Sequence, residues 1–221
     1  GAFLLLVDPR ITLDAPAVYL QAGLSDTLAK WYEARLLSRD VSPLPHTATL
    51  GLHVAKTIND ALLDKGAQAF HDQALHTLSP AFIEVVDAII AGGGMVGGLG
   101  EKYTRVAAAH ALHNGMSVLE ATHDKLHGTK VAYGILVQSA LEKDERELSL
   151  LYDKFIELGL PTSFRDLGVD PDDEVQMDAV VQATLVPHES IHLLPFPVDA
   201  AALKSAIKTV EKLSGQSHST H

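Results

Sequence analysis

Residues 82–97 read FIEVVDAIIAGGGMVG, and this stretch decides between two fold classes. Gly92, Gly94 and Gly97 satisfy the pattern G-x-G-x-x-G of a dinucleotide-binding loop. That loop needs a β-strand before it and a helix N-terminus after it, where the pyrophosphate binds. The apolar residues that precede the glycines recur instead at helical spacing. The stretch therefore predicts a helix that ends in a Gly-rich loop through Gly100, and it argues against a dinucleotide site.

The same helical periodicity returns along most of the remaining chain. From residue 15 onward, stripes of apolar residues are separated by short turns rich in Gly, Pro and Asp. Segments that are apolar on one side and joined by short connections are typical of helix bundles. We predict an all-α bundle over residues 15–213, followed by a small, polar and disordered tail at 214–221.

The N-terminal segment does not fit this bundle. Phe3–Val7 reads as a strand buried on both faces, bounded by Asp8-Pro9. No second strand pattern follows it, although a strand needs neighbours in a sheet. We expect residues 1–14 to be an edge strand and linker that belong to a sheet outside this chain.

Composition excludes several classes of protein. The chain has 221 residues, 28 acidic against 17 basic, and a formal net charge of −11, which argues against binding nucleic acid. It contains no Cys, so a disulfide framework, a thiolate zinc site and a Cys nucleophile are all excluded. No apolar run approaches the ~20 residues of a membrane span, and no signal-peptide pattern opens the chain. We expect a soluble, cytoplasmic protein.

Four of the twelve histidines lie between residues 110 and 127. His110 and His113 are spaced i, i+3, and His123 and His127 are spaced i, i+4, so either pair could form half of a metal site. Gly115 should break the first helix, which would let His110 face His127 from a neighbouring element. The alternative is that these are solvated or hydrogen-bonded helix histidines, and spacing alone leaves both open.

A carboxylate could complete such a site. Asp26 follows Ser25 in an apolar-periodic segment, where we expect it in the first turn of a helix. An acid at that position is stabilised by the helix dipole, and taken alone this structural role is the favoured interpretation.

Four segments carry a family resemblance when taken together. They are GLSDTLAKWYEAR at 23–35, AAAHALHNG at 107–115, HGTKVAYG at 127–134 and ESIHLLP at 189–195. In this order and spacing, the chain over residues 16–212 resembles the glycerol dehydrogenase group of the metal-dependent (iron-containing type) alcohol dehydrogenase superfamily. Residues 94–110 are most similar to a branch that includes hydroxycarboxylate dehydrogenases.

The resemblance implies a fold. Members have an α/β nucleotide-binding domain followed by a helical metal-binding domain of the dehydroquinate synthase-like type. This chain resembles the second domain only, and the strand at Phe3–Val7 would belong to the first.

It also implies site residues. By matching position, the metal ligands would be Asp26, His110 and His127, and His113 would lie beside the nicotinamide and the substrate in a proton-relay role. Members that favour iron carry a His where this chain has Lys30, so the resemblance favours Zn²⁺, with Fe²⁺ as the alternative. NAD or NADP would be bound mainly by the missing domain, and we assign no cofactor-binding residue to this chain.

The implied function is oxidoreductase chemistry. The chain would be the metal-binding half of an NAD(P)-dependent alcohol dehydrogenase acting on glycerol-like polyols or small 2-hydroxy acids, with the metal as Lewis acid on the substrate oxygen. Alone it should be inactive, and it should form homo-oligomers or associate with the missing domain. Two alternatives are a non-catalytic helical metal-binding or interaction module, and a dehydroquinate synthase-like lyase. Asp26 argues against the lyase, because that family is expected to have a glutamate there.

Overall fold

The computed structural model describes residues 4–217 and divides into two compact units, Gly1–Arg105 and Val106–His221. No strand occurs within residues 4–217, so the predicted all-α class is confirmed. The strand predicted at Phe3–Val7 is not formed in its described part: Leu4–Val7 lies outside regular secondary structure, and Phe3 is outside the described residues. The physical reason is that no neighbouring strand is present to hydrogen-bond with it, and Leu4 and Leu6 are 74% and 90% exposed.

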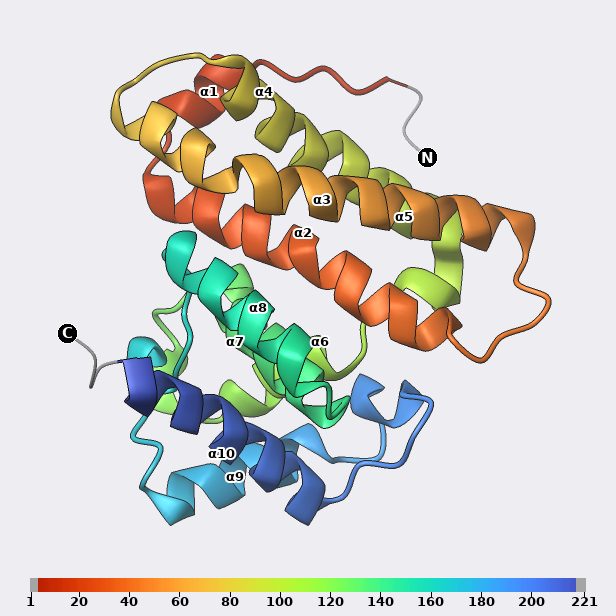
Figure 1. The fold of residues 1–221 in the computed structure, drawn as a ribbon, viewed down its shortest axis with the longest axis vertical. Helices are drawn as coiled ribbons and strands as arrows, with labels where there is room; N and C mark the ends of the chain where they lie inside the picture. Colours follow the sequence, from red (N-terminus) through yellow and green to blue (C-terminus); the bar gives the residue numbers. More distant parts are fainter. Residues whose placement is uncertain (1–3, 218–221) are drawn as a thin grey trace. The chain divides into compact units, whose positions relative to one another are not determined.

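The first unit is built around two long helices that lie side by side (Figure 1). These two helices are α2 (Ala17–Ser38) and α3 (His46–Ala74). Buried side chains on them and on residues 80–100 form the core of the unit, among them Leu28, Leu62 and Phe82. Ser79 caps the start of α4 (Pro80–Asp87), because its hydroxyl accepts a hydrogen bond from the Phe82 backbone N–H at 3.0 Å. The elements of this unit are α1 (Pro9–Leu13), α2 (Ala17–Ser38), α3 (His46–Ala74), α4 (Pro80–Asp87), the π-helix η1 (Ala88–Gly92), α5 (Gly93–Gly100) and the 3₁₀-helix η2 (Glu101–Thr104).

The glycine-rich stretch is helical, which corrects the predicted loop through Gly100. Helix α4 continues through the π-turn η1 into α5. Glycine is used there for close packing against α3: a Cβ on Gly92 would lie 2.5 Å from Ile58 Cγ2, and a Cβ on Gly51 would lie 2.8 Å from the Gly100 backbone N. The stretch is preceded by a helix and contains no loop, so it lacks the structure that a dinucleotide site requires.

The segment Pro80–Thr104 is 25 residues long and its most apolar window has a mean hydropathy of 1.6. By length and composition alone it could cross a membrane. A third of that window is buried within the protein, where Val85, Val86 and Val96 contribute to the core. A core helix of a soluble protein has the same length and composition, so this segment is weak evidence for a membrane span.

The second unit packs around α7 (His127–Leu141), which is buried along nearly its whole length. Three helices contact it (Figure 1): α6 (Ala108–Met116), α8 (Glu145–Glu157) and α10 (Ala200–Ser217). Helix α10 continues to Ser217, so residues 214–217 are helical where we predicted a disordered tail, and residues 218–221 lie outside the described part. The elements of this unit are α6 (Ala108–Met116), η3 (Glu120–Thr122), α7 (His127–Leu141), α8 (Glu145–Glu157), η4 (Arg165–Leu167), α9 (Glu174–Thr184), η5 (Ser190–Leu193) and α10 (Ala200–Ser217).

A half-buried acid, Glu211, connects α10 to α7. The hydroxyl of Tyr133, which is fully buried, donates to Glu211 Oε1 at 2.7 Å, and the Phe164 backbone N–H donates to the same oxygen at 2.9 Å. The rings of Tyr133 and Phe164 also stack with centroids 4.6 Å apart. Burial raises the pKa of Glu211 above its ordinary value of 4.5, although the two hydrogen bonds oppose the shift.

This shift predicts a pH dependence of stability. Because the folded-state pKa of Glu211 is raised, its contribution to stability is fully present below about pH 4.5 and is lost as the pH rises through the folded pKa. Glu211→Gln keeps an acceptor for both donors and removes the titration. We expect the urea midpoint of this variant to exceed that of the unsubstituted chain at pH 8, with the difference shrinking toward pH 4.5. A difference independent of pH would contradict the assignment.

Candidate metal centre

His110 is carried by a helix that the second unit holds rigidly. The backbone N–H groups of Ala108 and Ala109, at the start of α6, donate to the buried Gln138 Oε1 at 3.0 and 3.2 Å. This side chain satisfies two of the N–H groups that a helix N-terminus leaves without partners. Because Gln138 lies on α7, the same bonds fix the position of α6 relative to α7. Gly134 on α7 allows the close approach, since a Cβ there would lie 2.4 Å from the Ala109 carbonyl oxygen.

His127 is the first residue of α7, and a buried lysine anchors the turn before it. Lys130 is 6% exposed, and its ammonium donates to Ser117 Oγ at 3.3 Å and to the Thr122 carbonyl at 3.4 Å. Burial lowers the pKa of Lys130. These bonds connect the first turn of α7 to the segment that follows α6, and they therefore fix the backbone position of His127.

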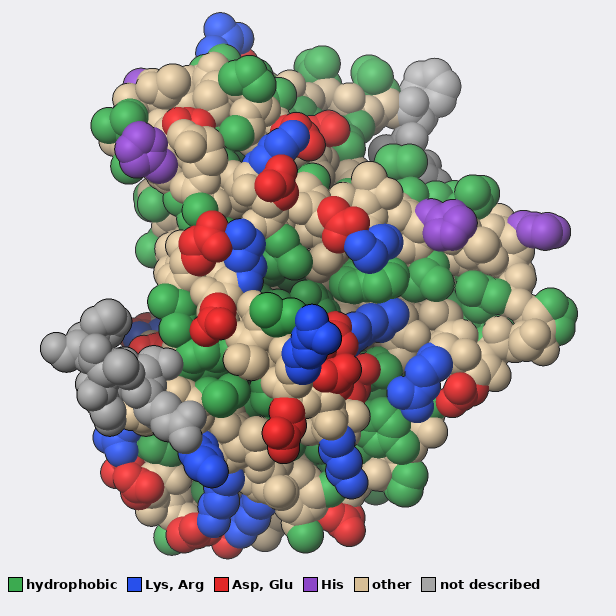
Figure 2. Space-filling view, in the orientation of Figure 1, with side chains coloured by type: hydrophobic (Ala, Val, Ile, Leu, Met, Phe, Trp, Pro, Cys, Tyr) green, Lys and Arg blue, Asp and Glu red, His purple; other side chains and the backbone are tan. Residues whose placement is uncertain are grey.

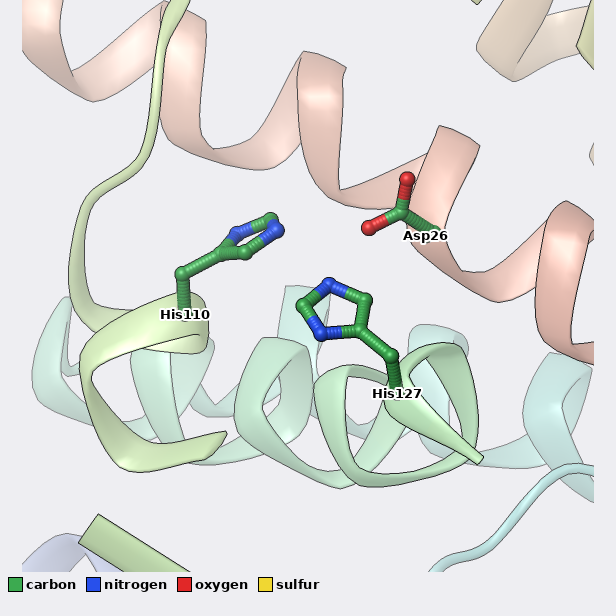
Figure 3. A group of neighbouring side chains, drawn as sticks. All are labelled: Asp26, His110 and His127. Carbon is green, nitrogen blue, oxygen red and sulfur yellow. The ribbon is translucent and has the colours of Figure 1, made fainter. Parts of the chain in front are cut away.

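Three imidazoles of this unit come together. The ring centroids of His110 and His127 are 5.3 Å apart, and those of His113 and His127 are 4.2 Å apart. His113 Nε2 lies 3.2 Å from His127 Nδ1. Figure 3 shows the rings of His110 and His127 facing one another from α6 and α7. Spacing alone left open which histidines pair, and the structure brings together the residues from neighbouring elements.

His113 is neutral at physiological pH. Burial, followed by the effect of the neighbouring His127, lowers the pKa of His113 from 6.5 to about 4. Its Nδ1 lies 3.0 Å from Asn114 Oδ1. A neutral imidazole has one protonated and one unprotonated nitrogen, so this ring can donate one hydrogen bond and accept another.

His123 takes no part in this cluster. It lies at the end of η3, which is separate from α7, so the i, i+4 relation of His123 and His127 does not fall on one helix. Its Nε2 lies 3.0 Å from the Ser117 carbonyl oxygen. His192, in the segment at 189–195, has its Nε2 3.1 Å from the Leu185 carbonyl oxygen.

Asp26 lies in the first unit, in the middle of α2. Our expectation that it occupies the first turn of a helix is wrong, because α2 begins at Ala17. The dipole of a helix N-terminus therefore does not account for an acid here. Its side chain is 32% exposed, and Oδ2 lies 3.9 Å from the ammonium of Lys30, one turn further along the helix. Figure 3 labels Asp26 on this helix.

Sequence reasoning missed two polar residues beside the histidines. Asn114 Nδ2 donates to both carboxylate oxygens of Glu189, at 3.2 and 3.1 Å. Asn114 and Glu189 stand within the segments at 107–115 and 189–195 that carry the family resemblance. Only the fold brings them together, since they are separated by α7, α8 and α9 in the chain.

Charged side chains are mixed on the surface that Figure 2 draws, with acidic and basic groups interspersed. Ion pairs of this kind include Lys204 with Asp178 and Arg165 with Asp172.

No family model matches the chain. Known proteins do: hydroxycarboxylate dehydrogenase A of Escherichia coli strain K12 is 52% identical over 209 residues, which is 95% of this chain and 58% of that protein. Glycerol dehydrogenase of Pseudomonas putida is 35% identical over 215 residues, again 95% of this chain and 58% of the relative.

Over nearly its whole length, the chain matches part of the glycerol dehydrogenase group. The crystal structure of a probable glycerol dehydrogenase from Sinorhizobium meliloti 1021 agrees, with a TM-score of 0.84 and 30% identity over 94% of this chain and 59% of that one. This group is the one that the sequence resembles, and its relatives carry dehydrogenase names. The chain spans a little more than half of the length of the curated relatives that it matches.

Proposed function

We propose that the chain is the metal-binding half of an NAD(P)-dependent alcohol dehydrogenase. The observation that carries the proposal is the imidazole cluster of α6 and α7, where His110, His113 and His127 meet at positions that match the family. The names of relatives support hydroxy compounds as substrates: hydroxycarboxylate dehydrogenase A, glycerol dehydrogenase and glycolaldehyde reductase. Glycerol-like polyols or small 2-hydroxy acids are therefore the proposed substrate classes.

The proposed metal ligands are Asp26, His110 and His127. Each offers one ligand atom, a carboxylate oxygen or an imidazole nitrogen. Two neutral imidazoles and one carboxylate are ligands that suit Zn²⁺, and the complex of Zn²⁺ with them keeps a net positive charge. Fe²⁺ is the alternative metal. Lys30 stands where iron-favouring members have a histidine, which supports Zn²⁺. Asp26 lies well past the start of α2 at Ala17, so the dipole of the helix N-terminus does not account for an acid there, and we propose metal ligation as its role.

Each side chain of the proposed site has a separate role in catalysis. The cation would supply Lewis acidity toward the substrate oxygen. Asp26 would balance part of its charge, and His110 and His127 would hold it from helices that Gln138 and Lys130 fix in place. The neutral ring of His113 can donate a hydrogen bond from one nitrogen and accept one at the other, which suits the relay role that the family implies. Hydride transfer to or from the nicotinamide needs orientation, which a rigid helical frame provides.

The remaining partners are proposals of the same kind. NAD or NADP would be bound mainly by an α/β nucleotide-binding domain, to which Leu4–Val7 would contribute an edge strand. An apolar segment that is exposed in one copy of the chain favours pairing, either with such a domain or with a second copy. We place the protein in the cytoplasm, acting on small molecules.

The proposed function can be tested with a joined protein, in which the nucleotide-binding part of the 52% identical relative is fused to this chain. We expect the chain alone, loaded with Zn²⁺, to bind NAD⁺ and NADH no tighter than about millimolar in calorimetry, where the free energy of binding is only about −4 kcal/mol. The joined protein should reduce NAD⁺ with a diol or a 2-hydroxy acid.

The joined protein carrying His127→Ala serves as the matched control. Equal rates for the two joined proteins, when both fold and bind NAD⁺, would refute the catalytic role and favour a non-catalytic binding module. A dissociation constant in the low micromolar range for the chain alone would refute the assignment of the cofactor site. Conversion of a sugar phosphate without net reduction of NAD⁺ would favour the lyase alternative.

A further inference from the structure

A continuous row of hydrogen-bonding groups leads from a carboxylate to His127. Both oxygens of Glu189 accept from Asn114 Nδ2, at 3.2 and 3.1 Å. Asn114 Oδ1 lies 3.0 Å from His113 Nδ1, and His113 Nε2 lies 3.2 Å from His127 Nδ1. All four residues belong to the second unit. We call this row the Glu189–His127 relay.

The chemistry of its first member gives the relay a direction. A carboxylate only accepts hydrogen bonds, so the amide of Asn114 must turn its NH₂ group to Glu189 and its oxygen to His113. The amide oxygen also only accepts, so His113 Nδ1 must carry the proton. A neutral imidazole has a single N–H, which leaves His113 Nε2 as an acceptor. His127 Nδ1 must then be the donor.

This hydrogen-bond pattern also determines the protonation of Nε2, the second ring nitrogen of His127. When the neutral ring carries its proton on Nδ1, its lone pair is on Nε2, and a metal binds an imidazole through a lone pair. Ligating histidines generally donate their second ring N–H to an acceptor that fixes the tautomer and the ring orientation. Here the acceptor is another imidazole, whose own tautomer depends on Asn114 and Glu189.

We propose that Glu189, Asn114 and His113 are positioning residues that hold His127 in the tautomer with its lone pair on Nε2, ready to bind the metal. The effect on metal affinity rests on the proposed function, whereas the tautomer itself is a property of the metal-free chain. Both can be measured separately.

The first measurement is long-range ¹H–¹⁵N correlation NMR of the metal-free chain, above the pH range in which imidazoles titrate. The ¹⁵N shifts of the two ring nitrogens identify which one is protonated, and His→Gln variants assign the signals. We expect both His113 and His127 to carry their proton on Nδ1. Asn114→Leu removes the acceptor and should shift both rings toward protonation on Nε2. The double variant Asn114→Asp with Glu189→Gln keeps an acceptor oxygen for His113 and a donor from residue 189, and it should preserve the tautomers.

The second measurement is Zn²⁺ affinity by competition with a chromophoric chelator. Substitutions of residues that orient metal ligands typically weaken binding by about 10–100-fold, and we expect a loss in that range for Asn114→Leu. The double variant Asn114→Asp with Glu189→Gln should bind within a few-fold of the unsubstituted chain. Asp124→Asn, an exposed acid close to His127 in sequence and outside the relay, is the control. Far-UV circular dichroism checks that each variant folds.

The outcomes separate the two claims. If His127 of the unsubstituted chain carries its proton on Nε2, the relay is overturned whatever the metal does. If the tautomers follow Asn114 as expected but the unsubstituted chain binds no metal, the relay stands and the proposed function fails. If metal binds and Asn114→Leu changes neither the tautomers nor the affinity, the relay is overturned while the proposed function stands.

Discussion

We expect His110→Ala and His127→Ala to abolish stoichiometric Zn²⁺ binding, from about one ion per chain to none after dialysis against a weak chelator. Each substitution removes one of three proposed ligands. Residues that merely orient ligands already cost about 10–100-fold in affinity, so loss of a ligand should weaken binding by more than about 100-fold. Metal analysis of the dialysed proteins measures this directly. Asp26→Asn, which keeps the shape and removes the charge, should lose the metal as well.

His123→Ala is the matched control. It removes an exposed imidazole close to His127 in the sequence whose Nε2 lies 3.0 Å from the Ser117 carbonyl oxygen. We expect it to retain one Zn²⁺ per chain. Loss of the metal in His123→Ala, with retention in His110→Ala, would show that the i, i+4 pair is the site and that the ligands inferred from the family are wrong.

The second large effect concerns the packing of α6 on α7. We expect Gly134→Ala to lower the free energy of unfolding by about 3 kcal/mol, the upper range for inserting an atom into a packed core. The added Cβ would lie 2.4 Å from the Ala109 carbonyl oxygen and 2.9 Å from its Cα, so the backbone of α6 would have to move. The same displacement moves His110 away from His127. Zn²⁺ affinity should therefore fall together with stability, as measured by urea denaturation and chelator competition.

Gly97→Ala is the control for this experiment. A Cβ on Gly97 in α5 meets no atom within 4 Å, so alanine should raise stability by about 0.5–1 kcal/mol through its better helix propensity. Equal effects of the two substitutions would mean that Gly134 is not needed for the contact between α6 and α7.

Periodicity was enough to predict the class of fold. The helices around Leu28, Leu62 and Phe82 follow from apolar stripes, and Ser79-Pro80 marks the start of α4 as a cap should. The glycine-rich stretch was predicted as a loop because glycine is a poor helix former. That local preference is overridden where a small residue permits close packing, as at Gly92 against Ile58. Such a contact is not visible in the sequence.

The candidate site was predictable only in part. The spacing of histidines allowed two pairings, and a choice between them needed either the family resemblance or the fold, which places His110 and His127 on separate helices. The predicted position of Asp26 in the first turn is wrong because α2 already begins at Ala17. No side chain caps that N-terminus, so the sequence does not mark the start of the helix clearly. Asn114 and Glu189 carry no spacing pattern at all. Their hydrogen bond depends on how α6 and the start of η5 pack, which only the three-dimensional structure determines.

We propose that His110 and His127 bind one divalent metal together with the carboxylate of Asp26. X-ray absorption at the zinc edge of the chain loaded with one equivalent of Zn²⁺ measures this, because the outer-shell scattering counts the imidazoles bound to the metal. We expect a first shell of nitrogen and oxygen at about 2.0–2.2 Å with two imidazoles. A single imidazole, or three or more, would contradict it.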